Sequence, residues 1–315
     1  MRVLITGSSG QIGTNLAIAL LQSGHDVVGV DTRPNTWTSR IQTHLIDLST
    51  TPLDVAPFRI GAAHLGAVDA VVHLAAHAKV HALVERPLGA FENHAMVTNA
   101  LEFARNNRVP ILLASSREVY GNAIARGVPV PESAADFRAA PSPYAAMKLA
   151  SEGLAASYRR CYGTPFAVIR FSNVYGRFDH DLARLERAIW VFRDRIARDL
   201  PLTVYGADKV LDFTHVDDAV AGICACLTRL VAGTATVIGE TFNLAYGAGY
   251  PLVGVVDLIA HTLGRRPRVR IEPARAGEVT WYVADIAKAR AAFGYDPKVP
   301  VTVGVPRAIL EMPLA

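Results

Sequence analysis

The chain has 315 residues, of which 51% are hydrophobic and 19% are charged, and this composition excludes a disordered protein. The formal net charge is +4 from 32 basic and 28 acidic residues, and without a dense basic stripe this excess predicts no nucleic acid partner. No uninterrupted apolar run reaches the roughly 18 residues of a transmembrane helix, so we also expect no membrane partner.

Two features of the chain predict a cytoplasmic location. The sequence passes from Met1 directly into a strand-like run, which leaves no room for a signal peptide. The cysteines Cys161, Cys224 and Cys226 are odd in number, and the last two lie in an apolar, helix-like run. A disulfide framework is therefore not expected.

Short apolar runs alternate with longer helical segments along the first part of the chain. Residues 3–5, 27–30, 70–74, 111–114 and 166–169 predict buried parallel strands, and residues 11–23 and 143–162 predict helices. This alternation predicts an α/β fold with a Rossmann-type doubly wound parallel sheet. Because it weakens after about residue 175, we predict a dinucleotide-binding domain over 1–175, with some later segments crossing back, and a smaller C-terminal substrate-binding lobe over 176–315.

A glycine-rich turn follows the first predicted strand and opens the first predicted helix. It contains Gly7, Gly10 and Gly13, and glycine permits a tight turn, a close approach of backbone to a pyrophosphate and close packing of helix on strand. The amides of Gln11 and Ile12 lie at the helix N-terminus, which favours negative charge. The turn therefore predicts a dinucleotide site.

The residues after the next two strands bear on which dinucleotide binds. Asp31 ends the second predicted strand, where a carboxylate can accept hydrogen bonds from ribose hydroxyls and repels a 2′-phosphate. We therefore predict NAD, although Arg33 opposes this choice because a guanidinium can accommodate that phosphate. Asp47 and Leu48 end the following predicted strand, where the carboxylate can meet the adenine amino group; a simple turn aspartate is the alternative.

Tyr144 and Lys148 begin a predicted helix, four residues apart, so that they share one face. A lysine ammonium beside a phenol lowers the phenol's pKa, which suits the tyrosine to act as a general base. Ser116 ends a preceding predicted strand, at the sheet edge that faces the ligand crevice. We predict that Ser116, Tyr144 and Lys148 are catalytic, with Ser116 and Tyr144 also contacting substrate and Tyr144 and Lys148 the cofactor.

These motifs resemble the extended short-chain dehydrogenase/reductases of the nucleotide-sugar epimerase/dehydratase family. Further matching segments are residues 71–76, 173–176, 212–218 and 275–278, so the resemblance extends through nearly the full chain. It implies an NAD-dependent isomerase, similar to UDP-sugar 4-epimerases, that acts on a nucleotide-diphosphate sugar. It also implies a homodimer formed through two helices of each copy.

The resemblance assigns further residues. It implies that Leu74, Ala75, Ala76 and Asn93 line the cofactor, that Asn173 and Arg275 contact the substrate diphosphate, that Val204 and Tyr205 pack beside the base, and that Glu278 binds the ribose. One departure is Leu211, where many members carry a diphosphate-binding arginine. Either Arg275 carries more of that work, or a basic residue such as Arg177 or Arg187 substitutes.

The residues after Ser116 bear on the reaction. Arg117 occupies the position of an acid that dehydratases of this family use, which argues against dehydration, and Glu118 matches a glutamate of uronate decarboxylases. We predict 4-epimerisation of a UDP-hexose or UDP-hexuronic acid through a 4-keto sugar. The alternatives are decarboxylation or another reaction that forms a 4-keto sugar, and a non-enzymatic NAD-binding sensor. Arg117 either recognises a uronic acid carboxylate or packs on Tyr120 at the surface.

Three histidines, His73, His77 and His81, are spaced like metal ligands. His73 belongs to a predicted strand end, however, so the three do not share one helix. We therefore expect no metal site.

Overall fold

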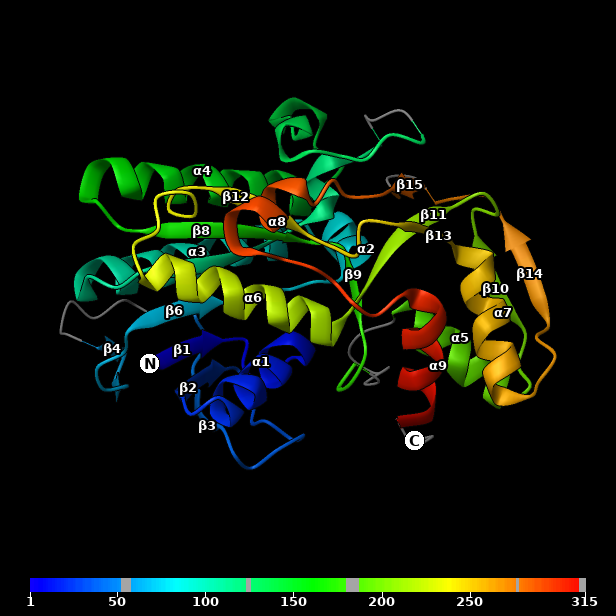
Figure 1. The fold of residues 1–315 in the computed structure, drawn as a ribbon, viewed down its shortest axis with the longest axis horizontal. Coiled ribbons are helices and arrows are strands. Elements are labelled where there is room, and N and C mark those ends of the chain that lie inside the picture. The colour runs from blue at the N-terminus through cyan, green and yellow to red at the C-terminus, as the bar shows by residue number, and fades with distance from the viewer. Residues whose placement is uncertain (52–57, 123–125, 180–186, 276–277, 312–315) are drawn as a thin grey trace.

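The computed structural model describes residues 1–51, 58–122, 126–179, 187–275 and 278–311. Its centre is a seven-stranded sheet (Figure 1) with the order β12 (Thr241–Leu244), β8 (Phe166–Phe171), β7 (Ile111–Ser116), β6 (Ala70–His73), β1 (Arg2–Thr6), β2 (Asp26–Asp31) and β3 (Gln42–Leu45). Every neighbouring pair is parallel. The predicted α/β fold with a doubly wound parallel sheet is therefore confirmed.

The apolar run of β1 explains why helices cover both faces of this sheet. Val3 and Ile5 belong to one core cluster, whereas Leu4, which points the other way, belongs to a second. The first cluster lies under α1 (Gln11–Gln22) and α6 (Val216–Val231), and the second under α3 (Leu88–Asn107) and α4 (Pro143–Tyr162). Strands buried on both faces are the reason that the sequence shows continuous apolar runs here rather than alternation.

The smaller lobe lies beside the carboxyl ends of the strands (Figure 1). It contains β9 (Asn173–Tyr175), α5 (Ala188–Ala197), β10 (Leu202–Tyr205), β11 (Val210–His215), β13 (Gly249–Pro251), α7 (Leu252–Leu263), β14 (Val269–Glu272), β15 (Trp281–Tyr282) and α9 (Val301–Glu311). Strand β12 and helices α6 and α8 (Ala287–Phe293) come later than residue 175 but pack with the sheet. The division of the chain near residue 175 stays a prediction.

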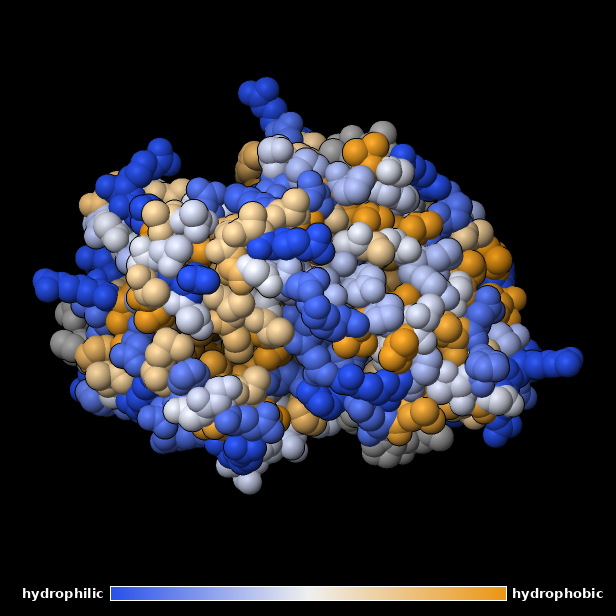
Figure 2. Space-filling view, in the orientation of Figure 1, coloured by the Kyte–Doolittle hydropathy of each residue, from blue (hydrophilic) through white to orange (hydrophobic). Residues whose placement is uncertain are grey.

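Shorter elements complete the described part of the chain: β4 (Arg59–Ile60), β5 (Ala63–His64), α2 (Val80–Glu85) and three 3-10 turns at Arg117–Tyr120, Glu132–Ala134 and Phe137–Ala139. Among the described residues, no helix combines the length and apolarity needed to cross a membrane. Figure 2 shows hydrophilic side chains gathered where α9 lies beside the start of α6, with apolar residues scattered around them. Cys161, Cys224 and Cys226 are all free thiols.

The strand order indicates where a ligand crevice lies. The order runs outward from β1 in both directions, through β2 on one side and β6 on the other. In open α/β sheets, ligands bind outside the carboxyl ends of the strands at such a switch point. The glycine-rich turn follows β1 and residues 74–76 follow β6, so these two segments meet at that crevice.

Candidate functional site

The glycine-rich turn approaches the chain after β6 so closely that side chains are excluded. Gly7 has a φ of 72°, and a Cβ atom there would lie 2.7 Å from the amide nitrogen of Ala75. At Gly13 a Cβ atom would overlap the carbonyl oxygen of Gly7 and lie 2.9 Å from Ser8 Cα. The glycines therefore have the two roles predicted from the sequence, the tight turn and the close contact of helix with strand.

The first turn of α1 offers unpaired polar groups to the crevice. Helix α1 begins after Gly10 with no side-chain cap on its amides. The side chain of Gln11 is buried, and neither its oxygen nor its nitrogen has a hydrogen-bond partner among the described residues. Ile12 is half-buried beside it. Buried polar groups without partners are rare, so this turn fits a bound anionic group such as a dinucleotide pyrophosphate.

Asp31 and Arg33 lie at the end of β2 beside this turn. Asp31 is buried and accepts a hydrogen bond of 3.0 Å from the Ser9 amide. The Arg33 guanidinium donates to the Ser9 carbonyl oxygen at 3.2 Å and lies 3.8 Å from an Asp31 carboxylate oxygen. Arg33 is therefore folded onto the turn and partly neutralised by Asp31, an arrangement that suits ribose hydroxyls better than a 2′-phosphate.

The remaining predicted cofactor residues surround the same end of the sheet. Asp47 and Leu48 lie two and three residues beyond the end of β3 rather than at its end, which corrects the expected strand boundary. Asp47 is exposed and accepts from Ser49, which lowers its pKa, whereas Leu48 is buried. Residues 74–76, which follow β6, are half-buried.

Asn93 contacts the loop that follows β6. Its side chain accepts from the His77 amide at 2.6 Å and donates to the His77 carbonyl oxygen at 3.0 Å. Both polar ends of the side chain are therefore engaged by the backbone. Asn93 therefore fixes the path of the loop after β6, and its contact with the cofactor stays a prediction.

The three predicted catalytic side chains converge at the carboxyl ends of β7 and β6. Ser116 ends β7, and Tyr144 and Lys148 project from the first turns of α4, which begins with Ser142 as its capping residue. Lys148 Nζ donates to the Ala114 carbonyl oxygen at 2.8 Å and lies 5.7 Å from the centre of the Tyr144 ring. A lysine held by β7 beside a phenol is the arrangement that a tyrosine base requires.

Burial controls the protonation of this cluster. It raises the pKa of Tyr144 to about 12, an effect that a hydrogen bond with Ser116 opposes. It lowers the pKa of Lys148 to about 8, while the carboxylate of Glu152 acts in the opposite direction. Burial and the nearby charge on Lys148 lower the pKa of His73 to about 3, so His73 is neutral.

The three histidines lie in different settings. His73 is buried in β6 and bonded to Thr6 at 2.8 Å, His77 pairs with Glu92, and His81 pairs with Glu85 on α2. The described part of the chain contains no group of histidine, cysteine and acidic residues that could hold a metal ion.

From the sequence we did not identify a buried ion pair, Glu152–Arg170, that lies one helical turn from Lys148. Glu152 lies one turn after Lys148 on α4, binds Arg170 at 2.6 Å and accepts from Ser115 at 2.5 Å. Arg170 also donates to the Tyr120 hydroxyl at 2.9 Å. The sequence did contain a sign of this pair. Glu152 lies four residues after Lys148, so the helix places an acidic side chain on the same face as Tyr144 and Lys148, which packs toward the sheet.

Arg117 is half-buried, and its guanidinium lies over the ring of Tyr282 instead of that of Tyr120. Its side chain is 12% exposed, lies 5.8 Å above the ring of Tyr282 and pairs with Glu118 at 2.9 Å. One of its terminal nitrogens, Nη1, is buried without a hydrogen-bond partner. The charges of Arg117 and Glu118 both act on the pKa of Tyr144, so the pair lies near the proposed reacting centre.

In the smaller lobe, the structure brings together three of the residues expected to hold the nucleotide. The guanidinium of Arg275 lies 3.9 Å from the centre of the Tyr205 ring, and the Arg275 amide donates to Glu278 at 3.0 Å. Val204 does not join them: it has no exposed surface, because residues along β10 alternate in direction and Val204 lies on the buried side, opposite to Tyr205. Asn173 is half-buried and donates to the Asp212 carbonyl oxygen at 2.8 Å.

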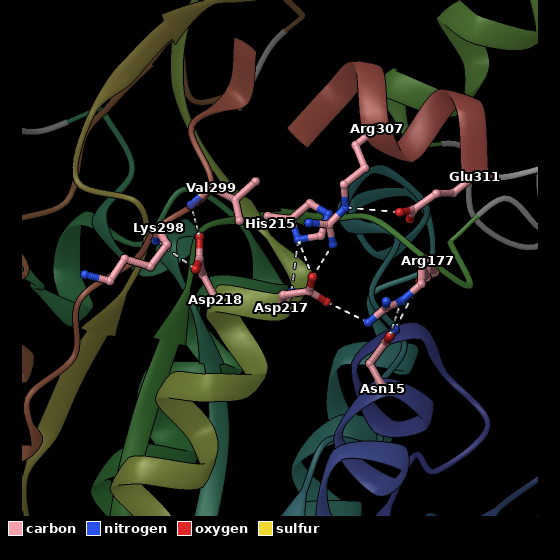
Figure 3. Close-up of polar contacts among 9 residues, drawn as sticks. All are labelled: Asn15, Arg177, His215, Asp217, Asp218, Lys298, Val299, Arg307 and Glu311. Carbon is pink, nitrogen blue, oxygen red and sulfur yellow. Dashed lines mark hydrogen bonds and ion pairs between the residues drawn. The ribbon is translucent and has the colours of Figure 1, made fainter. Parts of the chain in front are cut away.

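Leu211 is buried, and the two arginines considered as substitutes for the missing one have other partners. Arg177 donates to Asn15 and Asp217 on the side of the molecule where α1 meets α6 (Figure 3), so it is committed away from the Tyr205–Arg275 cluster. Arg187 pairs with Asp179 at 3.0 Å, and its charge lowers the pKa of Tyr144 against the effect of burial. Of the two, only Arg187 acts on the catalytic cluster.

Comparison with known proteins extends these observations. Residues 3–245 match the NAD dependent epimerase/dehydratase family. UDP-glucuronate 4-epimerase 1 of Arabidopsis thaliana is 30% identical over 332 residues, which cover 98% of this chain and 75% of that protein.

Two solved structures show the same architecture. The UDP-glucuronic acid 4-epimerase from Bacillus cereus, in complex with UDP-glucuronic acid and NAD, has a TM-score of 0.85 at 26% identity, with 99% of each chain covered. The UDP-glucose 4-epimerase from Thermus thermophilus, in complex with NAD, has a TM-score of 0.83 at 26% identity, with 98% of each chain covered.

Proposed function

The chain belongs to the NAD-dependent epimerase/dehydratase family, and we propose that it is an NAD-dependent UDP-sugar 4-epimerase. The observation that carries this proposal is the convergence of Ser116, Tyr144 and Lys148 beside the glycine-rich turn. The relatives named as 4-epimerases support the choice of reaction.

Tyr144, Lys148 and Ser116 have different roles in the proton transfer. Bound NAD supplies the acceptor and donor of hydride at the sugar C4. Tyr144 removes the proton of the C4 hydroxyl. Burial raises the pKa of Tyr144, and the hydrogen bond with Ser116 and the charges of Arg187 and Arg117 act in the opposite direction and favour the phenolate. Ser116, which ends β7 next to Tyr144, orients the C4 oxygen. Loss of the hydroxyl proton and of hydride leaves a 4-keto sugar, and Tyr144 returns the proton when the opposite face of C4 is reduced.

Inversion at C4 requires the sugar to turn while the nucleotide stays in place. We propose that Tyr205, Arg275 and Glu278 form the nucleotide end of the site, where the Arg275 guanidinium, which lies over the Tyr205 ring, would bind the diphosphate. Binding energy from this remote part of the substrate retains the 4-keto sugar without fixing its orientation.

Arg117 bears on the class of sugar. Its Nη2 atom pairs with Glu118, but its buried Nη1 atom has no hydrogen-bond partner. The guanidinium can therefore donate to one more anionic group. We propose that this group is the C6 carboxylate of a UDP-hexuronic acid. Decarboxylation of the same substrate is the second candidate, because the carboxylate of Glu118 also acts on Tyr144.

The setting of Asp31 and Arg33 supports NAD over NADP, because the buried carboxylate would repel a 2′-phosphate and Arg33 is folded back onto the turn. We further propose a homodimer through α3 and α4, and a cytoplasmic location in which Cys161, Cys224 and Cys226 remain reduced.

The test is incubation of the purified protein with UDP-glucuronic acid and UDP-glucose, without added cofactor, followed by NMR of the products. A C4 epimer is expected, and turnover without added NAD shows that the cofactor is retained. A pentose product with release of CO₂ would identify a decarboxylase instead. NAD binding with no turnover on either sugar would favour a sensor protein.

A further inference from the structure

The smaller lobe contains a buried lysine that neither the family pattern nor the proposed mechanism uses. Lys209 precedes β11, and its side chain is only 7% exposed. Its Nζ atom lies 2.9 Å from Glu278 Oε2, the same oxygen that accepts the Arg275 amide at 3.0 Å. Lys209 therefore meets the cluster of residues expected to hold the nucleotide.

The backbone around both partners is fixed independently of this ion pair. The Lys209 amide donates to Gly206 at 3.2 Å, and its carbonyl oxygen accepts from Leu252 at 2.9 Å. On the other side, Asn122 donates to the Glu278 carbonyl oxygen at 2.8 Å and accepts from the Thr280 amide at 2.9 Å. With the two main chains held in this way, the Glu278 carboxylate is oriented by the Lys209 ammonium together with the Arg275 amide.

Lys209 lies two residues before Leu211, the position at which the family resemblance implies a diphosphate-binding arginine. Lys209 directly precedes β11, and both Lys209 and Leu211 are buried, whereas Val210 between them is only half-buried. At position 211, where the family resemblance implies an arginine, this chain has a buried leucine, and it has a buried lysine two residues earlier.

We propose that Lys209 is a positioning residue for nucleotide binding, which neutralises Glu278 and turns it toward the ribose. This inference rests on the proposed function, because it assumes a nucleoside diphosphate in the lobe. Without Lys209, an unpaired Glu278 carboxylate would stand beside Arg275 and repel the diphosphate. With it, the net charge of the Lys209–Glu278–Arg275 cluster stays positive.

The experiment measures the Kd for UDP by calorimetry on the NAD-loaded protein. Lys209→Met and Lys209→Gln both remove the charge, and each should weaken UDP binding about tenfold, because one partner of a buried charge pair is lost. Lys209→Arg should restore most of the affinity. Lys288→Met is the matched control, since it removes a lysine that pairs with Glu240 at 2.8 Å outside this cluster. It should leave the Kd unchanged.

The double variant decides how Lys209 acts. In a Glu278→Gln background, Lys209→Met should change the Kd by less than about twofold, since its partner charge is already gone. Wild-type affinity in both Lys209 variants would overturn the inference, and so would an undiminished loss in the Glu278→Gln background, which would mean direct contact with the diphosphate. Failure of the wild-type protein to bind UDP or to epimerise UDP-sugars would overturn the proposed function itself.

Discussion

Replacement of Gly13 by alanine tests the cofactor site at the point where the fold leaves least room. The new Cβ would overlap the Gly7 carbonyl oxygen and lie 2.9 Å from Ser8 Cα. An ordinary contact between carbon atoms is about 3.5 Å or more, so α1 or the turn must move by at least about 0.6 Å. Such overpacking destabilises a fold by about 1–3 kcal/mol.

The same movement withdraws the first-turn amides from the pyrophosphate. One lost charge-assisted hydrogen bond is worth about 1.5–3 kcal/mol, so NAD should bind about 10- to 100-fold more weakly. Cofactor content after gel filtration, and titration of stripped protein with NAD, measure this effect. The matched control is Gly153→Ala on the exposed side of α4, where a Cβ meets nothing within 4 Å. It should raise stability by up to about 1 kcal/mol and leave NAD binding unchanged. Wild-type NAD affinity in Gly13→Ala would refute the reasoning.

Three further predictions concern the reacting centre. Tyr144→Phe should retain NAD and lose turnover by about 10²- to 10⁴-fold, as measured by NMR, and undiminished turnover would show that another group is the base. Turnover should fall as the pH rises through about 8, because burial lowers the pKa of Lys148 to about 8 and the ammonium is lost above it. Lys148→Arg stays charged throughout this range, so its slower reaction should lack the alkaline fall, and the same fall in this variant would assign it to another group. Arg117→Ala should lower kcat/KM for UDP-glucuronic acid relative to UDP-glucose by about tenfold or more, and an unchanged ratio would exclude Arg117 from recognition of a carboxylate.

The residues whose chemistry depends on local spacing could be predicted from the sequence. Gly7 and Gly13 act through the turn that contains them, and Tyr144 and Lys148 share a face because one helical turn separates them. Residues that act through distant partners could not be predicted in the same way. The partner of Lys209 is 69 residues away, and nothing near position 209 identifies it. Strand β10 shows a further limit, since its pattern alone does not tell which side of the strand faces the base, and Val204 lies on the buried side.

Arg177 shows why charge alone is not enough to identify the residue that takes the role of the arginine absent at position 211. One of its partners, Asn15, is 162 residues away and belongs to the helix that carries Gln11, whose carbonyl oxygen accepts from the side-chain amide of Asn15 at 2.9 Å. Asp217, at the start of α6, binds both Arg177 and Arg307 of α9 (Figure 3). The Arg177 guanidinium is therefore engaged between α1 and the start of α6, two helices that cover the same face of the central sheet. We therefore expect the charge that the nucleotide requires to come from the smaller lobe itself, from Arg275 beside the Lys209–Glu278 ion pair.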